Sequence, residues 1–443
     1  MLLTFTSSMT VYGTEQSTPD PAGNISLYAT AAVLMDADSG RVLYGKNADT
    51  PMAMASTTKI MTCIQILEHT DPDEMVTVSA YAASMPKVKL YIKQGEQYRV
   101  EDLLYSLMLE SHNDTAVALA EHVGRQFLPQ ELREKPVSEY TAEESRMAVA
   151  AFAALMNAKA AELGCENTWF ITPNGLDATE TFSLQDGSTV QKEHCTTAAE
   201  LARIMAYCIR ESPQKDAFLN ITRTVNYSFS ANGRSFSCYN HNAFLTMMDG
   251  ALSGKTGFTN KAGYCYVGAL ERDGKTFVVA LLACGWPNNK TYKWSDTREL
   301  MEYGLEHYSY RGFLEEGIRF DETMLRPVPV VNGQTDILGD TAYAGLEVAG
   351  RGTMENGGES LTGGAGEERQ GLLLREDEQI RVEYQWSKSL EAPVERGTKV
   401  GTIHYIVDDT VYLTEDIVTA ESVEPIEFAW CLRQIASRFL IKK

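Results

Sequence analysis

Three short motifs constrain this chain more than any other feature: Ser56-Thr57-Thr58-Lys59, Ser111-His112-Asn113 and Lys255-Thr256-Gly257, in that order. Each motif is weak evidence on its own, because strings this short occur by chance. Together, in this order, they supply the parts of a serine acyl-transfer site in which a lysine serves as the base. The chain therefore has to bring three segments that are far apart in the sequence to one place.

The first motif pairs a hydroxyl with an amine. A serine hydroxyl is a poor nucleophile near neutral pH and needs an adjacent base. Ser56 and Lys59 stand three residues apart, which places them on one face of a helix. The apolar run 60–67 continues that helix and predicts that Lys59 lies at the mouth of a hydrophobic core, where burial lowers the pKa of its amine. The alternative is an ordinary helix that carries S-x-x-K by chance.

The second motif adds another hydroxyl and an amide. Ser111 can relay a proton to a leaving amine, and Asn113 can hydrogen-bond both Lys59 and the substrate backbone. Apolar patterns over 103–109 and 114–123 predict two helices, so the motif falls in the break between them. The alternative is a plain helix N-cap, where Ser and Asn are favoured in any case.

The third motif is expected on a strand. Residues 264–270 and 276–283 read as strands joined by an Asp273-Gly274 hairpin turn. We therefore place Lys255-Thr256-Gly257 on a neighbouring edge strand that lines a cleft.

An ammonium and a hydroxyl fixed on such a strand suit a substrate carboxylate, and Gly257 allows an extended peptide to approach the backbone. A phosphate-binding loop is disfavoured, because Asp249 stands where that motif needs glycine.

Residues of about 28–310 resemble the serine-type D-alanyl-D-alanine carboxypeptidases, the low-molecular-mass penicillin-binding proteins. The resemblance rests on the three motifs and on further segments: Ala32–Tyr44, Asn47-Ala48-Asp49, Thr172–Asp177, Tyr239–Asn242 and Asp249-Gly250. It implies an α+β fold, in which a β-lactamase/transpeptidase-like catalytic domain, an antiparallel sheet with flanking helices, precedes a small all-β sandwich.

The resemblance also implies a mechanism. Ser56 attacks the carbonyl of the penultimate D-alanine of a peptidoglycan stem peptide, Lys59 takes the proton, and Ser111 protonates the departing D-alanine. Water then hydrolyses the acyl-enzyme, and β-lactams acylate the same serine. The catalytic residues would be Ser56, Lys59, Ser111 and Asn113, and the substrate-binding residues Lys255, Thr256, Gly257, Phe258, Thr259 and Lys293.

Two positions depart from relatives of this family. Phe258 stands where some relatives carry histidine, so only its backbone N–H, with that of Ser56, would serve the oxyanion. Lys293 occupies the approximate place of an arginine, and it keeps the charge without the bidentate fork.

Two other functions stay open: a D,D-endopeptidase of the same fold, and a non-enzymatic module that binds muropeptide or β-lactam. A β-lactamase is disfavoured, because no E-x-x-L-N segment lies between Asn113 and Lys255.

Composition agrees with this interpretation. The chain has 443 residues, 44% of them hydrophobic, enough for two domains. A formal charge of −21 disfavours nucleic acid as a partner. Eight cysteines without a C-x-x-C pair are expected to be free and mostly buried. We expect neither a metal nor a cofactor.

Four regions are expected. Residues 1–27 would be a signal-peptide remnant and linker, although no Lys or Arg precedes Arg41. Residues 28–310 would be catalytic, and 311–423 would form the β-sandwich, with a flexible Gly-rich insert at 350–371. The resemblance favours export, whereas the N-terminal sequence alone leaves it open.

Residues 424–443 predict an amphipathic helix. One face would carry Phe428, Leu432, Ile435 and Phe439, with Trp430, Arg433, Arg438, Lys442 and Lys443 around it. A basic helix bearing aromatic residues suits an anionic membrane surface. A helix packed on the β-domain is the alternative.

Three segments between the second and third motifs complete the expectations. Residues 128–144 read as an inserted loop or lid, 148–163 as a helix, and 177–193 as a polar surface excursion.

Overall fold

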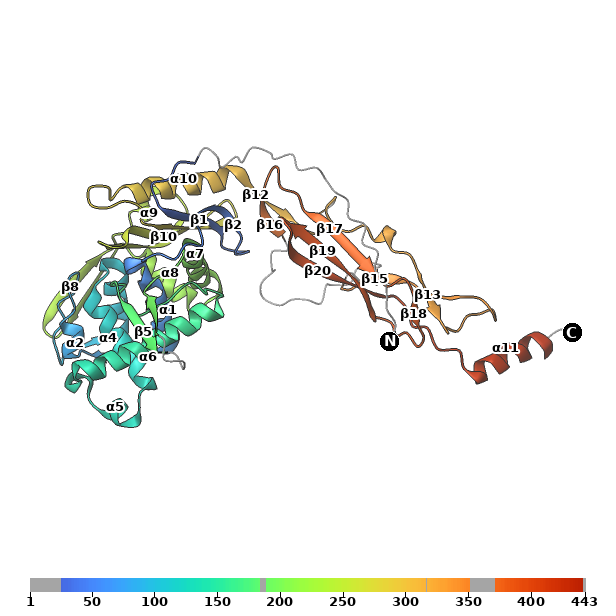
Figure 1. Ribbon diagram of the computed structural model, residues 1–443, viewed down its shortest axis with the longest axis horizontal. Helices are drawn as coiled ribbons and strands as arrows, with labels where there is room; N and C mark the ends of the chain where they lie inside the picture. Colours follow the sequence, from blue (N-terminus) through green and yellow to red (C-terminus); the bar gives the residue numbers. More distant parts are fainter. Residues whose placement is uncertain (1–24, 184–188, 316, 351–370, 441–443) are drawn as a thin grey trace. The chain divides into compact units, whose positions relative to one another are not determined.

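The computed structural model describes residues 25–183, 189–315, 317–350 and 371–440. They form two compact units: unit 1, which ends at Leu305, and unit 2, which begins at Glu306 (Figure 1). The expected signal-peptide remnant and nearly all of the Gly-rich insert lie outside the described residues. Leu27, at the end of the expected linker, is buried in unit 1.

Unit 1 is built on a five-stranded antiparallel sheet. Its strands, in spatial order, are β2 (Val42–Lys46), β1 (Ala31–Asp36), β11 (Lys275–Leu282), β10 (Gly263–Arg272) and β9 (Ala251–Thr259). Asp273 and Gly274, both at positive φ, form the predicted turn between β10 and β11. The third motif lies on β9 at the sheet edge, as predicted.

Both faces of this sheet are covered. Leu34 and Phe277 point to α10 (Tyr292–His307), where a Cβ on Gly304 would lie 3.0–3.1 Å from their side chains. Val33 and Met35 point the other way, into the core shared with the helices. Figure 1 shows α10 along one side of the sheet and α7 (Ala198–Ala206) on the other. Because neither face meets water, β1 is buried along its whole length.

The remaining elements of unit 1 surround the site. The helices and helical turns are η2 (Ala55–Thr58), α1 (Lys59–His69), α2 (Ala80–Ala83), α3 (Val100–Tyr105), η3 (Ser106–Glu110), α4 (Asn113–Gly124), η4 (Arg125–Phe127), α5 (Gln130–Glu134), η5 (Val137–Glu139), α6 (Ala142–Glu162), η6 (Tyr207–Glu211), α8 (Lys215–Arg223) and α9 (Phe244–Met247). Three hairpin-like pairs are β3 (Met75–Thr77) with β4 (Gln97–Arg99), β5 (Thr179–Ser183) with β6 (Thr189–Glu193), and β7 (Asn226–Ala231) with β8 (Arg234–Tyr239).

The segment expected as an inserted loop or lid connects α4 to α6 and is packed, because Leu128, Val137 and Tyr140 contact Ala148 in a small apolar cluster. The boundary between this segment and the next helix was predicted wrongly. Helix α6 begins at Ala142, six residues before the predicted start. Thr141 and Glu144 form a capping box there: the Thr141 hydroxyl accepts from the Glu144 N–H, and the Glu144 carboxylate accepts from the Thr141 N–H.

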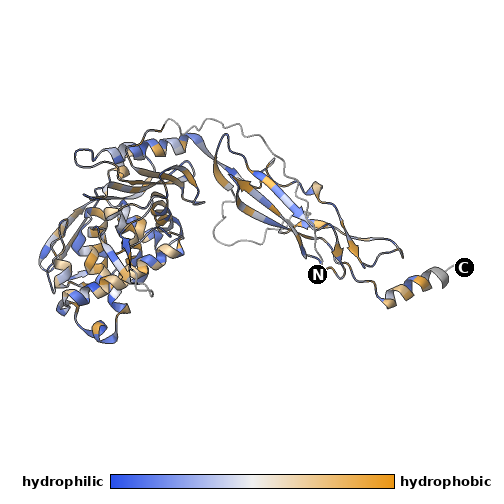
Figure 2. Cartoon of the chain, viewed as in Figure 1, coloured by the Kyte–Doolittle hydropathy of each residue, from blue (hydrophilic) through white to orange (hydrophobic). Residues whose placement is uncertain are grey.

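Unit 2 is an all-β body followed by a helix. Its described strands form a two-stranded sheet of β12 (Tyr308–Gly312) and β16 (Gly371–Arg375). A three-stranded sheet has the order β14 (Ala342–Ala344), β13 (Val328–Val331) and β18 (Leu390–Glu391). A four-stranded sheet has the order β15 (Leu346–Val348), β20 (Thr410–Thr419), β19 (Lys399–Val407) and β17 (Arg381–Trp386). A short turn, η7, spans Glu322–Met324, and α11 spans Phe428–Leu440. Figure 2 shows apolar residues alternating with polar ones along these strands, which is the pattern of a sheet with one face in a core.

Within the described ranges, every helix is too short or too polar to cross a bilayer. All eight cysteines are free, and six of them are buried, in agreement with the prediction.

Candidate active site

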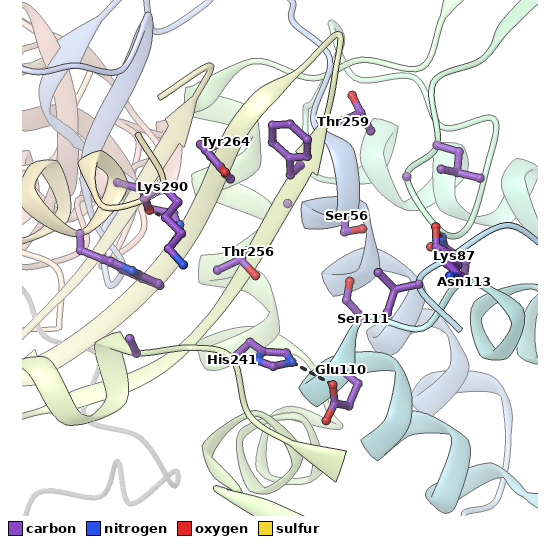
Figure 3. A pocket seen from close by; sticks show the side chains of 18 of the residues that line it. Ser56, Lys87, Glu110, Ser111, Asn113, His241, Thr256, Thr259, Tyr264 and Lys290 are labelled. Atoms are coloured by element: carbon purple, nitrogen blue, oxygen red, sulfur yellow. Dashed lines mark hydrogen bonds and ion pairs between the residues drawn. The ribbon is translucent and has the colours of Figure 1, made fainter. Parts of the chain in front are cut away.

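The three motifs meet at a cleft of about 570 Å³ in unit 1 (Figure 3). Ser56, Ser111 and Asn113 come to it from the helical side, and the third motif comes from β9. Of the residues predicted to bind or react, those that line the cleft are Ser56, Ser111, Asn113, Thr256, Gly257, Phe258, Thr259 and Lys293. Lys59 and Lys255 are buried behind this wall.

Ser56 lies in the helical turn η2, one turn before the amine that faces it. Lys59 begins α1, and its Nζ lies 2.9 Å from Ser56 Oγ. Ala55, just before the serine, has a φ of +49°, which L-residues rarely adopt outside strained functional turns. The spacing of three residues therefore brings hydroxyl and amine together, as the sequence predicts.

The Lys59 amine has three partners and no exposure to solvent. Besides Ser56, Nζ donates to Asn113 Oδ1 at 3.0 Å and to the backbone carbonyl of Asn174 at 2.6 Å. Burial, and then the charge of Lys255, hold the pKa of Lys59 well below its ordinary value. A neutral amine keeps two N–H donors for the two carbonyl oxygens, which leaves its lone pair for the Ser56 proton.

Asn113 is oriented by the segment opposite it. Its Nδ2 donates to the carbonyls of Pro86 and Lys87 at 3.3 and 3.2 Å, so Oδ1 must face Lys59. The first residue of α4 is Asn113 itself, and the N-cap is His112 without a side-chain cap. The N-cap alternative for this motif is therefore not realised.

Ser111 occupies the predicted break between helices. It follows the π-helical turn η3 and has a φ of +62°, which turns its side chain into the cleft. Lys255 Nζ donates to Ser111 Oγ at 2.9 Å. Burial lowers the pKa of Lys255 to about 7, so a cation that loses its proton near neutral pH stands beside the second serine.

Strand β9 approaches the nucleophile very closely. A Cβ on Gly257 would lie 2.8 Å from the Ser56 nitrogen, which only glycine avoids. In the described part of the chain, β9 pairs with β10 alone, so its other edge offers unpaired backbone groups to the cleft. An extended peptide can add to that edge.

Two of the predicted substrate-binding residues, Lys293 and Thr259, have interaction partners within the chain. Lys293 Nζ donates to the carbonyl of Lys290 and lies 4.8 and 4.7 Å from the ring centres of Tyr264 and Trp294. Thr259 Oγ1 donates to Asp177 at 3.1 Å. Both residues line the cleft.

The sequence did not identify Asn174 and Gly175 as site residues. The Asn174 carbonyl oxygen also lies 3.3 Å from Ser56 Oγ. Gly175 has a φ of +83°, and a Cβ there would lie 2.0 Å from the Ala55 carbonyl oxygen. The Pro-Asn-Gly turn was the available signal, because a glycine after asparagine marks a chain reversal.

A lysine-activated serine between a helical layer and the edge of an antiparallel sheet defines a class of serine acyl-transfer proteins. Sequence comparison refines that class. The family model described as D-alanyl-D-alanine carboxypeptidase matches residues 14–126 and 142–283, and the chain belongs to this family. A model described as penicillin-binding protein 5, C-terminal domain, matches residues 374–425.

Individual relatives agree. The D-alanyl-D-alanine carboxypeptidase DacF of Bacillus subtilis is 24% identical over 440 residues, covering 98% of this chain and 95% of its own. The structure of the carboxypeptidase DacD from Francisella tularensis superposes with a TM-score of 0.61 at 21% identity, covering 93% and 98% of the two chains. Penicillin-binding protein D2 of Listeria monocytogenes, solved with cefotaxime bound, has a TM-score of 0.50 at 28% identity, covering 64% and 99%.

Proposed function

We propose that this protein is a serine D-alanyl-D-alanine carboxypeptidase that removes the terminal D-alanine from peptidoglycan stem pentapeptides. One observation carries the proposal: Lys59 Nζ lies 2.9 Å from Ser56 Oγ, buried, with two fixed carbonyl acceptors for its own protons. This is the arrangement that a nucleophile with an unprotonated lysine base requires. Family membership supports the same substrate class.

The proposed reaction has two halves. In the first, Ser56 Oγ attacks the carbonyl carbon of the penultimate D-alanine, and its proton passes to neutral Lys59. The C–N bond then breaks, and the departing amine receives a proton through Ser111. In the second half, water attacks the ester and frees Ser56. Backbone N–H groups of Ser56 and Phe258 would hold the oxyanion, a contribution of several kcal/mol in such sites.

The substrate would lie as an extended strand along the free edge of β9. Its terminal carboxylate would meet the Lys255 ammonium and the Thr256 hydroxyl, while Gly257 leaves room for its backbone. A β-lactam presents a strained carbonyl in the same place and would acylate Ser56. The cefotaxime-bound relative from Listeria supports this assignment.

The test is D-alanine release from a peptide ending in Lys-D-Ala-D-Ala, with Ser56→Ala as the comparison. We expect release by the wild-type chain and none by the variant, with the same circular dichroism spectrum. If the wild-type chain traps penicillin on Ser56 but releases no D-alanine, a cross-linked muropeptide should be tried, since its cleavage would indicate an endopeptidase. If it traps penicillin and cleaves neither substrate, the chain is a binding module.

We also propose that the protein acts outside the cytoplasm and meets an anionic membrane through α11. Phe428, Leu432 and Ile435 are 84%, 57% and 45% exposed, which supports an apolar face open to a surface. Trp430, in contrast, is buried. Phe439 has no described side chain, and Lys442 and Lys443 lie outside the described residues.

Sedimentation with vesicles tests this second proposal. The full chain should sediment with vesicles containing phosphatidylglycerol and remain in solution with phosphatidylcholine vesicles. Leu432→Glu should abolish sedimentation while D-alanine release continues unchanged. Equal sedimentation of Leu432→Glu and the wild-type chain would contradict the role of this helix.

A further inference from the structure

A buried histidine outside the three motifs contacts two parts of the active site. His194, just before α7, is 3% exposed, and both of its ring nitrogens lie within hydrogen-bond distance of partners. The proposed reaction gives it no role. Cys195 follows it in the sequence, and its thiol lies 3.7 Å from the backbone carbonyl of Asn167.

The partners of the ring fix its tautomer. Nδ1 lies 3.0 Å from the backbone nitrogen of Ile171, a donor, so Nδ1 must accept and carries no proton. The proton is therefore on Nε2, which donates to Thr58 Oγ1 at 2.8 Å. The Thr58 hydroxyl in turn donates to the carbonyl of Ala55 at 2.8 Å. A single ring thus joins the segment 171–174 to the turn that carries Ser56.

That segment supplies the carbonyl that orients the base. Asn174 O accepts from Lys59 Nζ at 2.6 Å, and Thr62 Oγ1 donates to the neighbouring Pro173 carbonyl at 2.7 Å. The link requires a neutral ring, because a protonated imidazole has two donors and cannot accept from Ile171. Burial lowers the pKa of His194 to about 3, so the ring is neutral at working pH.

We propose that His194 is a positioning residue: as the Nε2-protonated imidazole it holds segment 171–174 against the Ser56 turn and so fixes the Asn174 carbonyl that orients Lys59. It touches neither the substrate nor the reacting atoms. The inference rests on the proposed function, since it assigns a role within that same site. Misplacing the base by about 1 Å can cost roughly 100-fold in rate, which sets the scale of the effect.

The test compares three variants by the rate at which penicillin labels Ser56, followed by mass spectrometry of the intact protein. His194→Phe keeps a ring of similar size without donor or acceptor, and should slow labelling about 10- to 100-fold. His194→Gln offers an acceptor and a donor on one carbon, and should stay within about tenfold of the wild-type rate. Phe152→Leu loosens the core of α6 away from the cleft, and should lower the melting temperature without slowing labelling.

If His194→Phe does not fold, a variant of Thr58, the partner of His194 Nε2, tests the same role. Thr58→Val preserves shape but breaks the connection to Ala55, and should slow labelling in the same way. In parallel, ¹⁵N-histidine spectra of the wild-type protein should show the His194 ring neutral and protonated on Nε2 between pH 5 and 8.

The possible results separate two failures. A wild-type chain that neither binds penicillin nor releases D-alanine would overturn the proposed function itself. A reactive wild-type chain with His194→Phe and Thr58→Val equally fast would overturn the positioning role alone. The positioning role would also be overturned if His194→Gln labelled no faster than His194→Phe, or if the His194 ring were protonated on Nδ1.

Discussion

The two units differ sharply in what they bury. Within the described residues, every buried Asp, Glu, Lys or His side chain lies in unit 1, and the one buried polar side chain of unit 2 is Thr419. The core of unit 2 is otherwise aliphatic and aromatic, as around Ile403 and Tyr405. Unit 2 therefore follows the ordinary rule for stable domains. Unit 1 departs from it at the motif lysines and also elsewhere, as at Asp36 and Asp296.

Burying a charge without partners costs so much free energy that the group is either paired or neutralised. Unit 1 uses both solutions. Asp114 accepts from the backbone N–H groups of Leu90, Tyr91 and Ile92, which hold the segment opposite Ser56 in place. Lys59 and Lys255 have lowered pKa values instead. We propose that Lys59 and Lys255 serve reactivity rather than stability, and the comparison of the two units can test this.

The largest effect is expected at the base. Lys59→Met keeps the length of the side chain and removes the amine, so labelling of Ser56 by penicillin should fall about 10²- to 10⁴-fold. The free energy of unfolding of unit 1 should fall by about 1–3 kcal/mol, because Asn113 Oδ1 and the Asn174 carbonyl lose their buried donor. Urea unfolding followed by circular dichroism measures the second quantity.

The matched change in unit 2 should behave in the opposite way. Ile403→Ala empties part of a fully buried core site and should cost about 2–5 kcal/mol in the unfolding of unit 2. Labelling of Ser56 should remain at the wild-type rate. If Lys59→Met instead unfolds unit 1, the buried lysine is a structural element and the contrast between the units fails.

Two glycines with nearly the same backbone sharpen the comparison. Gly175 in unit 1 and Gly397 in unit 2 have φ values of +83° and +82°, but a Cβ meets the Ala55 carbonyl at the first and open space at the second. Gly397→Ala should cost only the left-handed strain, about 1–2 kcal/mol, and leave labelling unchanged. Gly175→Ala should also displace the Ser56 turn and slow labelling about 100-fold.

Penicillin labelling and urea midpoints of the two alanine variants are the measurements. Similar labelling rates would mean that the close approach of Gly175 to Ala55 does not position the nucleophile.

The motif residues could be predicted because their chemistry is carried by side chains on regular elements. The spacing of Ser56 and Lys59, the helix break at Ser111 and the edge position of Lys255 follow from local periodicity and turn signals. The Asn174 carbonyl could not be found in this way, because a backbone oxygen has no signature of its own. Its place depends on a tertiary contact with Lys59.

Other misses have different physical causes. The start of α6 was missed because the capping box at Thr141 and Glu144 lies before the apolar pattern of the helix. Lys293 was expected to bind substrate, but sequence spacing does not reveal that its amine lies near the rings of Tyr264 and Trp294. In unit 2 the three-residue strands β14 and β15 carry too few residues for periodicity to detect.

A smaller effect concerns pH. Labelling needs Lys59 without its proton and Lys255 with its proton, so the rate should rise as pH passes the lowered pKa of Lys59. It should fall again as Lys255 loses its proton near pH 7. Beyond each limb the rate should change by up to about tenfold per pH unit. A profile of labelling rate from pH 4 to 10 measures both limbs.

Lys255→Arg tests the assignment of the basic limb. A guanidinium stays charged throughout this range, so the fall above pH 7 should disappear even if the maximal rate is lower. A basic limb that persists in this variant belongs to another group.

The smallest effect is expected at the N-terminal end of α6, away from the buried lysines, where a side-chain cap stabilises unit 1. Thr141→Ala removes the hydroxyl that caps α6 and should lower the free energy of unfolding of unit 1 by about 1 kcal/mol. Labelling of Ser56 at 25 °C should not change, because the cap touches no catalytic group. Thr141→Ser, which retains the hydroxyl, should restore most of the stability. A slower labelling rate in Thr141→Ala with an unchanged urea midpoint would mean that α6 positions the active site. The separation between residues that serve reactivity and residues that serve stability would then be wrong.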